Sequence, residues 1–227
     1  MNIAIVGRMT EDDDPWFGVR GDYIKYFSKL GAVSVVAPTN PVDWKPGHYG
    51  VVVLPGGADL SPTIYGAVPN ISTSRSDPFL EYFDLVLLKE TMKKTLVVGI
   101  CRGFQSLAVT CGLGEYFEQD LPTHPHSAGW TSAGHLIDVF DVSEKWRKTV
   151  VSLHHQGIVI KPETISSVFA SHGLRLLATA EYNQTEVVVE AFEGVNFLGV
   201  QWHPETVGDP TVLRWIDKKL RRSWIRE

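Results

Sequence analysis

The fold of this chain is decided by Val97-Val98-Gly99-Ile100-Cys101-Arg102-Gly103-Phe104-Gln105. An apolar β-type run, Leu96 to Ile100, leads into a cysteine between two glycines, and a helix-compatible run, Phe104 to Thr110, follows at once. This order predicts a strand, a sharp turn and a helix, with Cys101 at the corner. Because a corner residue has strained backbone geometry, its small neighbours Gly99 and Gly103 let strand and helix pass closely.

The corner would also activate the cysteine. It places the sulfur of Cys101 at a helix N-terminus, where unpaired N–H groups and the helix dipole favour a thiolate. The backbone N–H of Arg102 points at the same place and could hold an oxyanion. The alternative is a buried cysteine that merely packs, and this short pattern alone does not decide between the two.

Length and composition are those of an ordinary soluble globular protein with one large or two small domains, and the lack of an internal repeat or linker favours one. The 227 residues carry a net charge of -5, with 44% hydrophobic and 21% charged residues, so we expect one domain over residues 1–227. The charge gives no reason to bind nucleic acid or an anionic membrane. No apolar run approaches a membrane span. Residues 1–7 lack the basic start of a signal peptide and predict a first strand, so we expect a cytoplasmic protein.

The two cysteines, Cys101 and Cys111, are not expected to form a disulfide. If both lie near one helix, ten residues separate them by ~15 Å, whereas a disulfide requires Cα atoms within ~7 Å. No paired C-x-x-C spacing indicates structural zinc. Cys111 is most simply a small core residue.

The first half of the chain alternates strands and helices, which predicts a mostly parallel sheet. Apolar runs predict strands at Ile3–Val6, Val33–Ala37, Val51–Leu54 and Leu96–Ile100. Helical spacing predicts helices over Asp22–Leu30, Pro78–Lys94 and Phe104–Thr110. The third strand ends in paired glycines, whose free N–H groups lie where such sheets bind ligands, although an ordinary turn also fits.

The second half predicts antiparallel additions to the sheet. Short β-type runs occur at Leu136–Val142, Thr149–Leu153, Leu174–Ala178, Glu186–Phe192 and Phe197–Gln201. We expect loops rather than long helices between them. A closing helix from about Pro210 has the apolar stripe Leu213, Ile216, Leu220 and Trp224. Two polar segments predict surface loops, the acidic Glu11–Asp14 and residues 120–130 with His124 and His126. The acidic loop could also attract a cation.

A cysteine nucleophile needs a base and a group that orients the base. His203 and Glu205 follow a predicted strand at spacing i, i+2. In extended chain such residues project to one side with Cα atoms ~6.6 Å apart, so the carboxylate can reach the near ring nitrogen. This is the geometry of a catalytic triad, although a lone His-x-Glu is more often a surface pair. His154, His155 and His203 could in principle bind a metal, but no further ligand has recognisable spacing to them.

Five motifs together carry a family resemblance. They are Pro55-Gly56-Gly57-Ala58-Asp59 with Pro62 and Tyr65-Gly66; Gly99-Ile100-Cys101-Arg102-Gly103-Phe104-Gln105; Ser152-Leu153-His154-His155-Gln156; Glu190-Ala191; and Gly199-Val200-Gln201-Trp202-His203-Pro204-Glu205. In this order the chain resembles class I glutamine amidotransferases, and within them the γ-glutamyl hydrolase branch, peptidase C26. The first fifty residues agree only in pattern.

The resemblance implies an α/β fold with a three-layer, flavodoxin-like, mostly parallel central sheet and antiparallel strands added in the second half. It implies Cys101 as nucleophile, His203 as base and later acid, and Glu205 as the orienting group. The oxyanion hole would be formed by the backbone N–H groups of Gly57 and Arg102.

The same resemblance implies Gln105, His155 and Gln156 as contacts of the glutamyl head group, and no metal or organic cofactor. The implied reaction is hydrolysis of a small γ-glutamyl amide through a thioester. The leaving amine stays open, because the acidic loop and the loop after Gly114 lie where such proteins differ.

Three alternatives remain. Since these residues include no synthetase domain, a glutaminase subunit that passes ammonia to a synthase partner fits as well. An inactive binding module would not need the triad. An α/β-hydrolase with cysteine in place of serine would use Asp138 or Asp141 as its acid, because its acid precedes the histidine.

Overall fold

The structure is a computed structural model, and it describes residues 1–9, 16–121, 134–140 and 145–224. Glu11–Asp14 and Asp141 lie outside the described residues, as do His124 and His126. Within the part described, no helix has both the length and the apolar character needed to cross a membrane.

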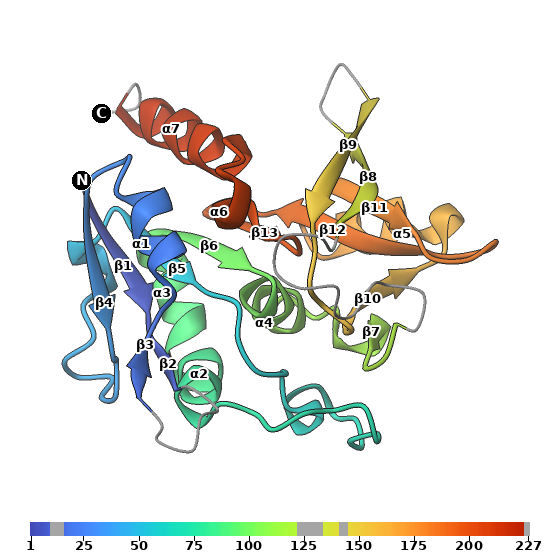
Figure 1. The fold of residues 1–227 in the computed structure, drawn as a ribbon, viewed down its shortest axis with the longest axis horizontal. Coiled ribbons are helices and arrows are strands. Elements are labelled where there is room, and N and C mark those ends of the chain that lie inside the picture. Colours follow the sequence, from blue (N-terminus) through green and yellow to red (C-terminus); the bar gives the residue numbers. More distant parts are fainter. Residues whose placement is uncertain (10–15, 122–133, 141–144, 225–227) are drawn as a thin grey trace.

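A mixed sheet forms the centre of the molecule (Figure 1). Its parallel half follows the order β4 (Ala32–Val36), β1 (Asn2–Val6), β5 (Val51–Leu54), β6 (Leu96–Ile100) and β13 (Phe197–Val200). Numbered by their order in the sequence among these five strands, they are arranged 2-1-3-4-5, which is the flavodoxin-like order. The parallel half therefore confirms the predicted fold class.

Beyond β13 the sheet continues with antiparallel strands. Their order is β12 (Val187–Glu193), β11 (Arg175–Glu181), β8 (Gly134–Phe140) and β9 (Lys145–Val151). A branch strand, β10 (Gly157–Ile160), pairs with β12 and with the short β7 (Phe117–Glu118). A separate two-stranded sheet joins β2 (Arg8–Met9) to β3 (Phe17–Gly18). The predicted antiparallel additions are thus present.

Helices cover both faces of the sheet because its strands carry apolar side chains on both sides. Ile3 and Ile5 of β1 pack on the face covered by α1 (Gly21–Phe27) and α7 (Thr211–Trp224). Ala4 and Val6 pack on the opposite face, which is covered by α2 (Pro78–Tyr82), α3 (Leu88–Lys94), α4 (Arg102–Thr110) and α5 (Pro162–Ser171). The result is the three-layer arrangement visible in Figure 1.

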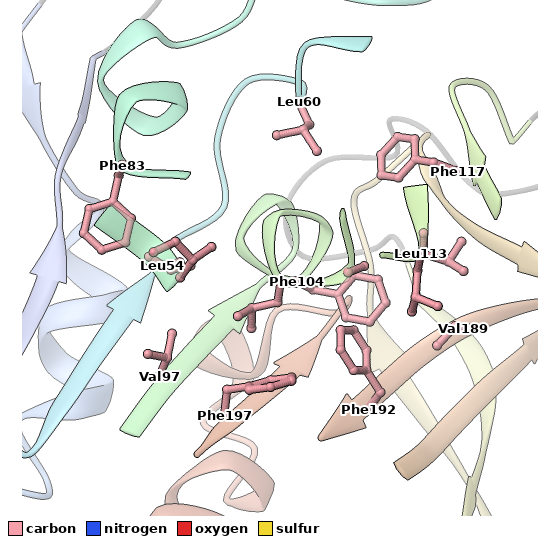
Figure 2. Packing of buried hydrophobic residues seen from close by; sticks show 14 of the residues in the cluster. Leu54, Leu60, Phe83, Val97, Phe104, Leu113, Phe117, Val189, Phe192 and Phe197 are labelled. Atoms are coloured by element: carbon pink, nitrogen blue, oxygen red, sulfur yellow. The ribbon is translucent and has the colours of Figure 1, made fainter. Parts of the chain in front are cut away.

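One apolar cluster joins the parallel and antiparallel halves of the sheet (Figure 2). The ring of Phe104 on α4 meets that of Phe192 on β12 edge to face, with centroids 5.1 Å apart. Phe192 in turn meets Phe197 on β13 at 5.9 Å. Leu54 and Val97 of the parallel half belong to the same cluster. Because this core packs against α4, it fixes the helix that follows Cys101.

Three predictions about the elements need correction. The second half contains the ten-residue helix α5 and the strand β10, where we expected loops. The helix expected over Pro78–Lys94 is interrupted by one π-helical turn, η3 (Phe83–Leu87). The first helix ends at Phe27, earlier than predicted. In α7, Ile216 is buried as expected, whereas the side chain of Trp224 is not among those described.

The crossing of α4 over the sheet generates a first prediction. A Cβ at Gly103 would lie 2.3 Å from the carbonyl oxygen of Leu54, which is backbone and cannot move aside. We expect Gly103→Ala to lower the free energy of unfolding by about 1–3 kcal/mol through overpacking. Gly47→Ala is the control, because nothing lies within 4 Å of a Cβ there. Urea denaturation measures both, and equal midpoints for the two variants would contradict the close crossing.

Candidate active site

Cys101 occupies the sharp corner that the sequence predicts. Its φ of 53° makes it the one non-glycine residue with positive φ among those the structure describes. It directly precedes α4, and its backbone N–H donates to the carbonyl of Val200 at 2.9 Å. Such strained backbone persists where the surroundings impose it, and it is concentrated at functional sites.

Three side chains meet around Gly56, where β5 ends. A Cβ at Gly56 would lie 2.8 Å from Cε1 of His203, 3.1 Å from the hydroxyl of Tyr23 and 3.5 Å from the Cβ of Cys101. Cys101 follows β6 and His203 follows β13. The candidate residues thus gather at the carboxyl ends of neighbouring parallel strands, where open α/β sheets bind ligands.

His203 and Glu205 form the expected pair. The Nδ1 of His203 is 2.6 Å from Oε1 of Glu205, and both side chains are buried. The backbone differs from the extended chain that we predicted, because Glu205 lies in the short helix α6 (Pro204–Val207). The first helical turn brings the carboxylate to the ring just as the extended chain was expected to do.

The electrostatics of His203 favour its charged form. Burial alone would lower the pKa of His203, but the Cys101 sulfur, which hydrogen-bonds to the ring, and the Glu205 carboxylate outweigh burial and raise this pKa to about 10. A protonated imidazole and an ionised sulfur stabilise each other in such a pair.

Tyr23 is a member of the site that the sequence did not reveal. Its buried hydroxyl accepts a hydrogen bond of 2.8 Å from the backbone N–H of Gly56. Burial and the negative charge of Glu205, with which the hydroxyl interacts, raise the pKa of Tyr23 well above its usual value. In the sequence Tyr23 is indistinguishable from the other apolar positions of its helix, so no signal could have found it.

The candidate oxyanion donors are Gly57 and Arg102. Arg102 opens α4, so its backbone N–H is among the first amides of the helix, which have no partner within the helix. Its guanidinium forms a buried ion pair with Asp84 and donates to Ser106 at 2.8 Å. Burial raises the pKa of Asp84 to about 6, against the opposite effect of Arg102. The side chain of Arg102 is thereby fixed while its backbone amide stays at the corner.

Of the three residues implied as head-group contacts, Gln105 contacts Gln156, whereas His155 contacts Asp59. Nε2 of Gln105 donates to the carbonyl of Gln156 at 3.1 Å. The side-chain amide atoms of Gln156 are buried and have no hydrogen-bond partner among the described residues. Nε2 of His155 lies 3.0 Å from Asp59, whose hydrogen bond raises the pKa of His155.

The partners of the carboxylates and histidines differ from those that the alternative interpretations require. Asp138 pairs with Arg147 at 2.7 Å and Lys145 at 3.1 Å on the β8–β9 hairpin, whereas the carboxylate on the ring of His203 is that of Glu205. The three histidines considered together as metal ligands have different carboxylate partners in the described structure: Glu190 for His154, Asp59 for His155 and Glu205 for His203.

The contact between His203 and Cys101 predicts selective chemistry at one cysteine. The pKa of His203 is raised, so its stabilising charge is fully present below about pH 6.5 and is lost as the pH rises through about 10. We expect iodoacetamide at pH 7 to modify Cys101, and His203→Ala to slow this reaction ~10-fold or more. Cys111 should stay unmodified, because burial raises its pKa to about 12. Peptide mass spectrometry measures both sites, and equal rates in the two proteins would refute the pairing.

Comparisons with known proteins give the family. The peptidase C26 model matches residues 3–205. The provisionally named glutamine amidotransferase-like protein YvdE of Lactococcus lactis is 31% identical over 88% of this chain and 85% of its own length. A provisionally named glutamine amidotransferase of Mycobacterium tuberculosis is 32% identical over 81% of this chain, which spans 61% of that relative.

Solved structures agree in fold. A glutamine amidotransferase from Thermotoga maritima has a TM-score of 0.57 at 15% identity, covering 98% of this chain and 85% of that one. A protein from Thermoplasma acidophilum, provisionally named as part of a GMP synthase, has a TM-score of 0.60 at 17% identity, covering 100% and 97%. The chain belongs to the peptidase C26 family and has the fold of the class I glutamine amidotransferases.

Proposed function

We propose that this protein hydrolyses a γ-glutamyl amide to glutamate and an amine through a thioester on Cys101. The observation that carries the proposal is the meeting of Cys101 and His203 around Gly56, with Glu205 on the far ring nitrogen. A nucleophile, a base and an orienting acid in contact are what acyl transfer requires.

In the proposed reaction each group has its own step. The sulfur of Cys101 attacks the γ-carbonyl carbon, and the negative charge that develops on its oxygen is held by the amides of Gly57 and Arg102. His203 gives its proton to the departing amine, and the C–N bond breaks to leave a thioester. His203 then takes a proton from water, which attacks the thioester carbonyl and releases glutamate and the thiolate. Glu205 keeps the ring oriented in both steps.

The glutamyl head group would be held by Gln105, His155 and Gln156. The unpaired amide of Gln156 is suited to this role, because a buried amide gains most when a ligand supplies its missing hydrogen bonds. The carbonyl of the same residue is fixed by Gln105. His155, whose pKa is raised by Asp59, offers a positive charge to a carboxylate.

The decisive experiment measures glutamate release from glutamine and a panel of γ-glutamyl amines by the reduced protein. We expect Cys101→Ala to lower kcat by ~10³-fold or more, because the residues of such a set act as a unit. Cys111→Ala is the matched control and should keep its activity, since this thiol is distant from the ion pair and its pKa is raised to about 12. A folded, reduced protein that turns over none of the panel would refute the proposal.

A second candidate is a glutaminase subunit that supplies ammonia to a synthase partner. It is favoured by the relatives named as glutamine amidotransferases and by the Thermoplasma structure named as part of a synthase. The same panel separates the two functions. A hydrolase prefers a substituted amine and acts alone, whereas a glutaminase prefers free glutamine and is stimulated by its partner.

We further propose that Tyr23 positions the triad. Tyr23→Phe removes the acceptor of the Gly56 N–H and the group beside Glu205, at a cost of about 1–3 kcal/mol for an unsatisfied buried donor. We expect kcat to fall ~10-fold or more with KM little changed, because each 1.4 kcal/mol corresponds to a factor of ten. Tyr26→Phe is the control on the same helix, since the Tyr26 hydroxyl donates to Asp209 instead. Equal kcat in both variants would exclude this role.

A further inference from the structure

A second cluster of polar side chains lies buried outside the proposed triad. It consists of His135 on β8, His154 in the segment after β9, and Glu190 on β12. Glu190 is 0% and His154 4% exposed, and the side chain of His135 is 14% exposed. One ligating atom from each residue lies within 4.8 Å of the other two. The proposed hydrolysis uses none of these side chains.

The geometry of this cluster fits a metal ion. Nε2 of His135 lies 3.0 Å and Nε2 of His154 3.5 Å from the same oxygen, Oε1 of Glu190. Bonds of about 2.0–2.2 Å from zinc to nitrogen or oxygen, at tetrahedral angles of about 109°, place ligand atoms about 3.3–3.6 Å apart. The His154–Glu190 separation lies in this range, the His135–Glu190 separation is shorter by about 0.3 Å, and the ligand atoms of the two histidines lie within 4.8 Å of each other. Two histidines and one glutamate are also a ligand set of zinc sites that retain an open position.

The ring of His154 is oriented as a metal ligand requires. Its Nδ1 lies 2.9 Å from the carbonyl oxygen of Gln156, so the N–H must be on Nδ1 and donate to that oxygen. Nε2 is thereby directed to Glu190. A backbone carbonyl that accepts from the second ring nitrogen is the usual support of a metal-bound histidine, because it fixes the tautomer and the ring plane.

The residues around the cluster favour a cation and leave a polar side chain beside the position of a water ligand. A fully buried carboxylate such as Glu190 is costly unless a positive charge compensates it. Gln201 lies opposite Glu190, to whose carbonyl its N–H donates at 2.8 Å, so both side chains share one face of the sheet. The side-chain amide atoms of Gln201 are buried and lack a hydrogen-bond partner in the described part of the chain. A water molecule on the open metal position could supply one.

We propose that His135, His154 and Glu190 bind a divalent transition-metal ion, with zinc as the ion best suited to the donor set. The site would tie β8 to β12 and to the segment that follows β9. Through the carbonyl of Gln156 it would also fix the residues proposed to hold the glutamyl head group. The metal site itself does not depend on the proposed hydrolase activity.

The test uses untagged full-length protein with both cysteines changed to alanine, because the pair of Cys101 and His203 could itself bind zinc. The protein is treated with a chelator, dialysed and titrated with Zn²⁺ against a chromophoric chelator, and in parallel with Co²⁺. We expect one equivalent of zinc per chain and the intense visible absorption of tetrahedral Co²⁺. The midpoint of thermal unfolding should rise with added zinc.

Two ligand variants and one control complete the design. Glu190→Gln and His135→Asn should each weaken zinc binding by ~100-fold or more, since direct ligands matter at least as much as their supporting groups. Asp59→Asn disrupts a separate imidazole–carboxylate pair, that of His155, and should bind zinc as the parent does. Circular dichroism reports whether each variant is folded. Binding far below one equivalent, or binding unchanged in a folded ligand variant, would overturn the proposal and leave a hydrogen-bonded His–Glu–His network.

Discussion

The positive φ of Cys101 is the constraint on which the structure of the site depends. A non-glycine residue held at positive φ costs about 1–3 kcal/mol, so the surroundings must impose this conformation. On one side, the N–H of Cys101 completes the ladder to β13. On the other, Gly103 lets α4 cross so close to the end of β5 that a single methyl group would meet backbone. The apolar packing of Phe104 against Phe192 secures the helix in that position.

The same constraint explains why the site forms where parallel strands end. Strands β5, β6 and β13 run in the same direction, so Gly56, Cys101 and His203 emerge at one edge although they are far apart in sequence. Each strand is followed by a different kind of group: β5 by a glycine without a side chain, β6 by a thiol and β13 by an imidazole. The antiparallel half contributes Gln156 to the site, because the segment after β9 brings its carbonyl to the side chain of Gln105.

The elements that sequence reasoning found are those with an unambiguous pattern. Strands β5 and β6 are short continuous apolar runs, which buried parallel strands require, and the predicted Val51–Leu54 and Leu96–Ile100 match their observed bounds. Helix α5 was missed because Ile165, Val168 and Phe169 are few apolar positions among polar ones. The π turn was missed because apolar residues recur at spacings near three and four on both sides of it, so the segment has the pattern of one continuous helix.

In the site, too, residues with a local sequence pattern could be predicted, whereas residues that only the fold brings together could not. Two local patterns in the sequence indicate a nucleophile and its base: Cys101 between Gly99 and Gly103, and His203 two residues before Glu205. Both could therefore be proposed without coordinates. The role proposed for Tyr23 rests on a contact with a residue more than thirty positions away, which only the fold brings to it. His135 is likewise brought to His154 and Glu190 by strand pairing, which no spacing in the sequence encodes.

The extra residue in the π turn η3 determines where the carboxylate of Asp84 lies relative to the rest of its helix. Each π turn holds one residue more than an α turn, so the helix beyond it is rotated by roughly 100° relative to an uninterrupted one. Asp84 stands in this turn and meets Arg102, while Leu88 just beyond it packs in the core. A deletion here would restore α-helical hydrogen bonding but could keep only one of these two contacts. Insertions and deletions in relatives of this chain should therefore be found in loops and avoid this turn.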